Sequence, residues 1–296
     1  MAVTPVIVAI GRSGEALAHR LSEVLKAPVH GREGRVNRAD AFFPDALDHV
    51  RDLFASGVPV IGVCASGILI RAVAPLLNDK RSEPPVLSVS DDGSVVVPLL
   101  GGHRGANRLA RRISEAIDAV AAVTTAGDVA LGVALDEPPA GWRLANPEDA
   151  KEAMAALLSG AGARIAGDAA SQAEWLDTIP RGDDVEILCT TGPVPADQAP
   201  ALVYHPTTAV LGVGCARDCP PEELEELALA RLDAAGLAPG ALAAVATVDI
   251  KADEPAVVGL ARRLGVPLRL FRPDELEAET PRCASSSEVV FAEVGT

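Results

Sequence analysis

A buried strand runs directly into a helix within the stretch Val58-Pro-Val-Ile-Gly-Val-Cys-Ala-Ser-Gly-Ile-Leu-Ile-Arg71. Its first six residues are mostly apolar, which predicts a strand covered on both faces. The turn that follows opens a helix whose first backbone N–H groups have no partner inside the helix, so it suits a carboxylate or phosphate. Alternatively, Ser66 caps this helix and the turn is a simple connection. The serine is not in a Gly-x-Ser-x-Gly elbow, so serine-hydrolase chemistry is not indicated.

The alternation of strand and helix continues on both sides of this stretch. Residues 6–10 form an apolar run, and in the turn Gly11-Arg-Ser-Gly14 Ser13 is placed to cap a helix over 14–26. Further along, the hairpin turn Asp91-Asp-Gly93 separates strands at 86–89 and 95–99, and a helix over 105–117 follows. We therefore expect an α/β domain over 1–125.

The end of the chain repeats the pattern, and the middle is less regular. Strands are expected at 208–214, 243–249 and 267–271, with helices between them. In the middle, a helix over 147–158 with Pro147 at its first position and strands at 185–189 and 201–204 predict a small unit. The predicted fold is α/β, with two mainly parallel α/β domains (1–125 and 208–296) and a small α/β linking domain (126–207).

Charge and hydropathy exclude several classes of protein. The chain has 41 acidic and 26 basic residues, for a formal net charge of −15. Because phosphate backbones are bound by basic stripes, nucleic acid is not an expected partner. No apolar run approaches the roughly 20 residues that a membrane-spanning helix needs, and the first residues lack the charge pattern of a secretory signal. We expect a cytoplasmic protein without membrane partners.

The five cysteines are an odd number in a long chain, which favours free thiols over a disulfide framework. Cys215 and Cys219 have no matching second pair of ligands at zinc spacing, so we expect no metal there.

A second polar motif is Gly101-Gly-His-Arg-Gly-Ala-Asn107. Gly102 lets the backbone approach a ligand, and His103 can transfer protons near neutral pH. Arg104 can hold a carboxylate, and Asn107 can both donate and accept hydrogen bonds. A polar surface loop is the alternative. Because this loop and the turn after residue 63 both follow predicted strands, we expect Ser66 and His103 to lie side by side at one sheet edge.

Two further polar segments follow predicted strands of the last domain. They are Gly212-Val-Gly-Cys-Ala-Arg217 and Thr247-Val-Asp-Ile-Lys-Ala-Asp-Glu-Pro255. Their polar residues are expected at the carboxyl ends of these strands, where ligands of open α/β sheets bind.

Taken in order, these motifs resemble the CbiG family of cobalamin (vitamin B12) biosynthesis. In the first domain the resemblance rests on Ala65-Ser-Gly-Ile-Leu-Ile-Arg71, Ala74-Pro-Leu-Leu-Asn-Asp-Lys80 and Val97-Pro-Leu-Leu-Gly-Gly-His103, and in the last on the two segments above. It spans nearly the whole chain. Relatives continue beyond the position of Thr296, so the last domain is expected to be incomplete and the chain to be the amino-terminal part of a fusion, with a precorrin-3B methyltransferase as the candidate partner.

The resemblance implies a cobalt-precorrin-5A hydrolase, which opens the δ-lactone of its substrate and releases acetaldehyde. It implies no cofactor, since any cobalt is carried by the tetrapyrrole substrate. His103 and Ser66 fit the catalytic roles, and the residues that fit substrate binding are Arg71, Lys80, Gly102, Arg104, Asn107, Arg217 and Lys251. Other cobalamin-pathway enzymes and a second copy of the chain are the partners left open. The alternative is a non-catalytic corrinoid-binding module.

Overall fold

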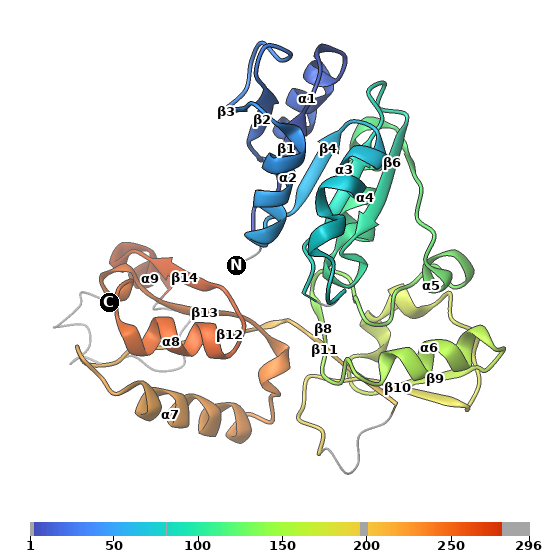
Figure 1. The fold of residues 1–296 in the computed structure, drawn as a ribbon. Coiled ribbons are helices and arrows are strands. Elements are labelled where there is room, and N and C mark those ends of the chain that lie inside the picture. Colours follow the sequence, from blue (N-terminus) through green and yellow to red (C-terminus); the bar gives the residue numbers. More distant parts are fainter. Residues whose placement is uncertain (1–2, 81, 196–200, 280–296) are drawn as a thin grey trace. The chain divides into compact units, whose positions relative to one another are not determined.

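The computed structural model describes residues 3–80, 82–195 and 201–279, and of His103 it describes the backbone alone. The chain divides after Gly132 into two compact units. Three sheets form their frameworks (Figure 1).

The first unit is built on a seven-stranded sheet with the order β3-β2-β1-β4-β5-β6-β7. Strands β1 to β5 are parallel to one another, whereas β6 is antiparallel to β5 and parallel to β7. The chain moves outward from β1 to β3 and then returns to place β4 on the other side of β1, so the strand order reverses between β1 and β4. The strands are β1 (Val6–Ala9), β2 (Val29–Arg32), β3 (Ala41–Phe43), β4 (Val60–Val63), β5 (Val86–Val89), β6 (Val95–Leu100) and β7 (Val120–Ala121).

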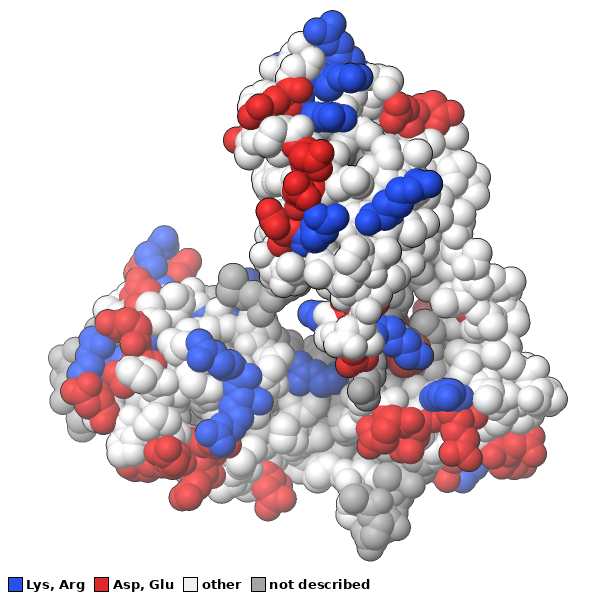
Figure 2. Space-filling model, viewed as in Figure 1, with Lys and Arg blue, Asp and Glu red and all other residues white. Residues whose placement is uncertain are grey.

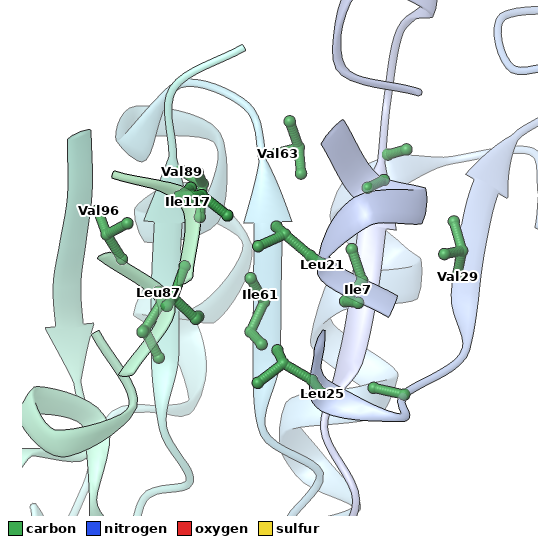
Figure 3. Close-up of a cluster of buried hydrophobic side chains, with 14 of the residues drawn as sticks. Ile7, Leu21, Leu25, Val29, Ile61, Val63, Leu87, Val89, Val96 and Ile117 are labelled. Atoms are coloured by element: carbon green, nitrogen blue, oxygen red, sulfur yellow. The ribbon is translucent and has the colours of Figure 1, made fainter. Parts of the chain in front are cut away.

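Helices cover both faces of this sheet, which explains why its strands are apolar on both sides. On one face Leu21 packs over Ile7 and Ile61, and Ile117 belongs to the same buried cluster (Figure 3). On the other, Phe54 and Leu69 pack over Val8 and Val60. The fully buried side chains each stabilise the fold by roughly 1.5–3 kcal/mol. The helices are α1 (Glu15–Leu25), α2 (Ala46–Ala55), α3 (Ser66–Val73), α4 (Ala106–Ile117) and α5 (Ala126–Ala130), with 3-10 turns η1 (Arg12–Gly14), η2 (Ala74–Leu76) and η3 (Gly102–Arg104).

The second unit contains two sheets. The first has the order β8-β11-β10-β9 and is parallel except for β8. Its elements are β8 (Trp142–Leu144), α6 (Ala150–Leu158), β9 (Ala163–Ala166), η4 (Ala170–Gln172), η5 (Glu174–Leu176), β10 (Val185–Cys189) and β11 (Leu202–Pro206).

The other sheet, β12-β13-β14, is entirely parallel. Leu224 of α7 and Val257 of α8 pack together with Val245 in its core. Arg143 of β8 donates to the carbonyl oxygen of Leu264 and so links the two sheets. The elements are β12 (Ala209–Gly212), α7 (Pro221–Ala234), η7 (Pro239–Ala241), β13 (Leu242–Val248), η8 (Asp249–Lys251), α8 (Pro255–Arg263), β14 (Leu268–Phe271) and α9 (Pro273–Glu279).

The predicted fold class is confirmed, since mainly parallel sheets lie in the first and last parts of the chain and a small α/β sheet lies between them. The exact domain limits stay a prediction. One helix start was wrong: α6 begins at Ala150, because Asn146 donates to Asp149 and accepts from the Val203 amide, which holds the preceding residues in a turn. In the described part of the chain, no helix has the length and apolarity to span a membrane.

Candidate functional site at the carboxyl edge of the first sheet

A pocket of 610 Å³ lies at the carboxyl ends of β1, β4 and β5, beside the point where the strand order reverses. Ligands of open α/β sheets bind at such a switch point, because the strand ends diverge there and leave a crevice. The pocket is lined by Ile10, Gly11, Ser13, Cys64, Ala65, Ser66, Ile68, Ser88, Ser90, Asp91, Val95 and Val97.

The helix α3 begins at this pocket. Ala65 is its extended N-cap residue and makes no side-chain cap bond, and Ser66 is the first helical residue. Ser66 therefore does not cap the helix, and it lines the pocket. The Ile68 N–H donates to the Ala65 carbonyl at 3.0 Å, whereas the backbone N–H groups of Ser66 and Gly67 precede the first helical hydrogen bond and suit an anionic oxygen.

The turn after β1 approaches β4 very closely. A Cβ atom on Gly14 would lie 2.5 Å from Cγ1 of Val63, so only glycine allows this packing. Ser13 does not cap the helix as predicted: its hydroxyl donates to Oδ2 of Asp91 at 2.5 Å. This bond joins residues 78 positions apart, and no local sequence pattern marks it. The hydroxyl is drawn away from the helix because the Asp91 carboxylate is the stronger acceptor.

Cys64 lies in the pocket wall as a buried thiol. Burial, with a smaller contribution from the charge of Asp91, raises the pKa of Cys64 to about 12. Its carbonyl oxygen accepts a hydrogen bond from the Ser88 hydroxyl at 2.6 Å. The thiol therefore stays protonated at neutral pH and is a poor nucleophile.

The predicted pairing of Ser66 with the His103 loop is wrong. The amide of Cys64 donates to the Val89 carbonyl at the carboxyl end of β5. Leu100, which precedes the loop, pairs with Val86 at the amino end of β5. The loop and the pocket thus lie at opposite ends of a four-residue strand, roughly 10 Å apart along it.

The glycines of this loop have a structural reason that involves no ligand. Gly101 has a positive φ of 77°, and a Cβ atom there would lie 2.6 Å from Cα of Pro85. Gly102, in contrast, would accept a Cβ atom without contact. The sequence predicted that the backbone of this loop approaches a ligand closely. In the structure, the close approach is between the backbones of Gly101 and Pro85.

The cations of the first unit that were predicted to bind substrate are exposed. Arg104 donates to the Ser82 carbonyl at 2.5 Å, and Arg71 donates to the Gly67 carbonyl at 2.9 Å. Arg104 thus contacts the loop that carries Lys80. On the face drawn in Figure 2, basic side chains stand among acidic ones.

Asn107 is buried and bonded within the protein. Its Nδ2 donates to Thr125 and to Asp128, each at 2.9 Å. Burial raises the pKa of Asp128, but hydrogen bonds from Thr125, Arg111 and Asn107 outweigh it and hold the pKa below its ordinary value. The amide thus ties α4 to α5.

In the second unit, Arg217 and Lys251 meet a residue that the sequence did not single out. Glu254 has a side chain with no exposure, and its Oε2 lies 4.0 Å from Nζ of Lys251 and 3.9 Å from Nη1 of Arg217. Neither Glu254 oxygen has a hydrogen-bond partner among the described residues. Arg217 also donates to Asp253 at 3.0 Å, and this bond raises the pKa of the Arg217 guanidinium.

Cys215 and Cys219 are free thiols, as expected, and Cys283 lies outside the described residues. Their freedom from metal stays a prediction that metal analysis of the purified protein would test. In the described part of the chain, no group of three or more His, Cys, Asp or Glu side chains is placed to hold a metal ion.

These features define a doubly wound α/β protein with a ligand pocket at its switch point, followed by further parallel α/β layers. Two family models match the chain: "Cobalamin synthesis G N-terminal" over residues 48–128 and "Cobalamin synthesis G C-terminus" over residues 209–296. The chain belongs to this cobalamin synthesis G (CbiG) family.

Curated relatives agree with the family models. "Cobalt-precorrin-5A hydrolase" of Salmonella typhimurium is 32% identical over 285 residues, covering 89% of this chain and 80% of that protein. A protein of the same name from Priestia megaterium is 24% identical and covers 82% of this chain and 71% of that protein. "Protein CobE" of Sinorhizobium is 46% identical over 86 residues, which are 29% of this chain and 56% of that protein.

Proposed function

We propose that this protein is a hydrolase of cobalamin biosynthesis that opens the δ-lactone of cobalt-precorrin-5A and releases acetaldehyde. The observation that carries the proposal is the 32% identity with the Salmonella hydrolase across 89% of the chain. The pocket at the switch point supports it, because it offers a sheltered site with helix-terminal N–H groups.

The chemistry divides into tasks that fit particular side chains. Lactone hydrolysis places negative charge on the carbonyl oxygen, and Ser66 with the first-turn N–H groups of α3 suits that oxygen. A tetrapyrrole substrate of this kind carries many carboxylates, so cations are needed to hold it. For that task we propose Arg71, Lys80 and Arg104 in the first unit. Arg217 and Lys251 are the candidate anion-binding residues of the second unit, taken by itself.

Proton transfer by His103 stays a prediction. For His103 to transfer a proton, the lactone must bind at the loop after β6. For Ser66 to act, the lactone must bind in the pocket, which lies at the opposite edge of the sheet. The two residues therefore belong to rival sites, and Gly102 belongs with His103. Asn107 binds Thr125 and Asp128, so its assignment to substrate requires these bonds to break.

A second candidate function, corrinoid binding without catalysis, is favoured by one observation. "Protein CobE" matches 86 residues, which are 29% of this chain. Part of this chain therefore has a counterpart in a protein whose match does not extend to the rest of the chain. For the hydrolase and for the binding module alike, we propose that any cobalt belongs to the bound tetrapyrrole and that the protein itself has no cofactor.

Incubation of the purified chain with cobalt-precorrin-5A tests the proposal. Acetaldehyde is measured by its NADH-dependent reduction with alcohol dehydrogenase, and the corrinoid product by mass spectrometry. We expect one acetaldehyde per substrate consumed, with heat-unfolded chain as the control. Binding of the corrinoid without acetaldehyde would establish the second candidate instead.

A further inference from the structure

Two residues that line the pocket have titratable side chains, Cys64 and Asp91. The thiol of Cys64 keeps its proton at neutral pH because burial raises its pKa to about 12. Asp91 is exposed to solvent. Among the described residues that line this pocket, the Asp91 carboxylate is therefore the group able to accept a proton from a water molecule.

The Asp91 carboxylate is tied to Ser13 through one of its two oxygens. Its Oδ2 accepts the hydrogen bond from Ser13, and no bond to its Oδ1 is formed by the described residues. The hairpin turn that carries Asp91 is fixed by its neighbour, because Asp92 accepts bonds from the Ser90 hydroxyl at 2.6 Å and the Ser94 amide at 3.0 Å. One oxygen is thus anchored and the other is available to a water molecule.

The same pocket contains the start of α3. Ser66 and Asp91 both line it, so a lactone bound there would meet helix-terminal N–H donors and a carboxylate together. Ester hydrolysis requires this pair of functions, a base for the water and donors for the carbonyl oxygen.

We propose that Asp91 is the general base of lactone opening and that Ser13 is a positioning residue that orients it; this rests on the proposed function. Oδ1 takes a proton from water while the water oxygen bonds to the lactone carbonyl carbon. The carbonyl electron pair moves onto its oxygen, where the α3 N–H groups stabilise it. When this intermediate collapses, the bond to the ring oxygen breaks and Asp91 returns the proton to that oxygen. One water is consumed, and a carboxylic acid and an alcohol are formed.

The test compares kcat and KM for acetaldehyde release by the full chain and its variants. Asp91→Asn should lower kcat by about 10²–10⁴-fold with little change in KM, because the amide cannot accept the proton. Ser13→Ala should lower kcat by a smaller factor, and Ser13→Thr should restore it, because the hydroxyl is kept. Glu115→Gln, an equal charge change on the exposed face of α4, is the matched control. Circular dichroism and corrinoid binding by absorbance show that each variant is folded.

His103→Gln separates the two rival sites. If the wild-type chain releases acetaldehyde, loss of kcat in Asp91→Asn with retention in His103→Gln supports the proposal. A folded Asp91→Asn chain with near wild-type kcat overturns it and leaves the proposed function intact. A folded wild-type chain that releases no acetaldehyde overturns the proposed function and the base assignment together.

Discussion

Asn107 and Asp128 form a partly buried hydrogen bond of 2.9 Å between α4 and the short helix α5. Asn107 is 7% exposed, and the Asp128 side chain is 2% exposed. The bond therefore lies in a low-dielectric setting, where loss of a donor to a carboxylate is costly.

Asn107→Ala should lower the free energy of unfolding by about 1.5–3 kcal/mol, the usual contribution of a hydrogen bond to a charged group. Urea unfolding followed by circular dichroism measures the change. Glu115→Ala, at an exposed position of the same helix, is the control and should change stability little. A raised KM with unchanged stability would instead give Asn107 the substrate-binding role that its sequence motif suggested.

The histidine pair predicts a dependence of stability on pH. His30 and His49 are 2.8 Å apart between Nδ1 and Nε2, and His49 stacks on Phe43. Burial lowers the pKa of both imidazoles below the ordinary 6.5, the charge of His30 adds to the effect on His49, and Asp40 and Asp52 oppose it. The unfolded chain then binds protons more readily. The stabilisation is complete above pH 6.5 and is lost as the pH falls through the lowered values.

The free energy of unfolding should therefore fall between pH 7.5 and 5.5, and the fall should be smaller in His49→Phe. This variant keeps an aromatic ring against Phe43 and removes one of the two titrating groups. Urea unfolding at several pH values measures both slopes. Equal slopes in the two proteins would contradict a role for this pair.

The buried thiol of Cys64 makes a prediction about chemical reactivity. With a pKa of about 12, its thiolate fraction at pH 8 is small. We expect iodoacetamide to modify Cys64 about 10³-fold more slowly than an ordinary exposed cysteine. Peptide mapping by mass spectrometry compares Cys64 with the partly exposed Cys219 in the same sample. Similar rates in the native protein, with no increase on adding urea, would rule out the buried state.

The course of the strands and helices could be predicted from the sequence because it depends on local patterns. The apolar run at 58–63 and the helix start after it lie where expected, as β4 and α3. The turn Asp91-Asp-Gly93 was also identified correctly. Its consequence was missed: a hairpin reverses the chain, so the loop after β6 must lie at the opposite sheet edge from the turn after β4.

The contacts that define the pocket could not be predicted, because they depend on tertiary packing. Ser13 and Asp91 are brought together by the parallel arrangement of β1, β4 and β5, and the two turn patterns that contain them do not indicate this contact. Glu254 is a similar case. A glutamate at the start of a helix is normally exposed, and its burial follows from how α8 packs on β13.

The ionic cluster of the last sheet gives the final prediction. Glu254 is completely buried, and Lys251, whose side chain is 12% exposed, is one of two cations that compensate its charge. Removing one partner of a buried pair leaves an uncompensated charge, so Lys251→Met should lower the free energy of unfolding by about 3 kcal/mol. Glu254→Gln in the Lys251→Met background should recover part of this loss, since the buried charge is then gone. The four proteins of this double-mutant cycle are compared by urea unfolding.

Arg263→Met, which breaks the more exposed pair with Glu225, is the matched control and should lower the free energy of unfolding by no more than about 1 kcal/mol. Additive effects of the Lys251 and Glu254 substitutions would mean that the two charges do not stabilise one another, and Arg217 would then be the cation that compensates Glu254.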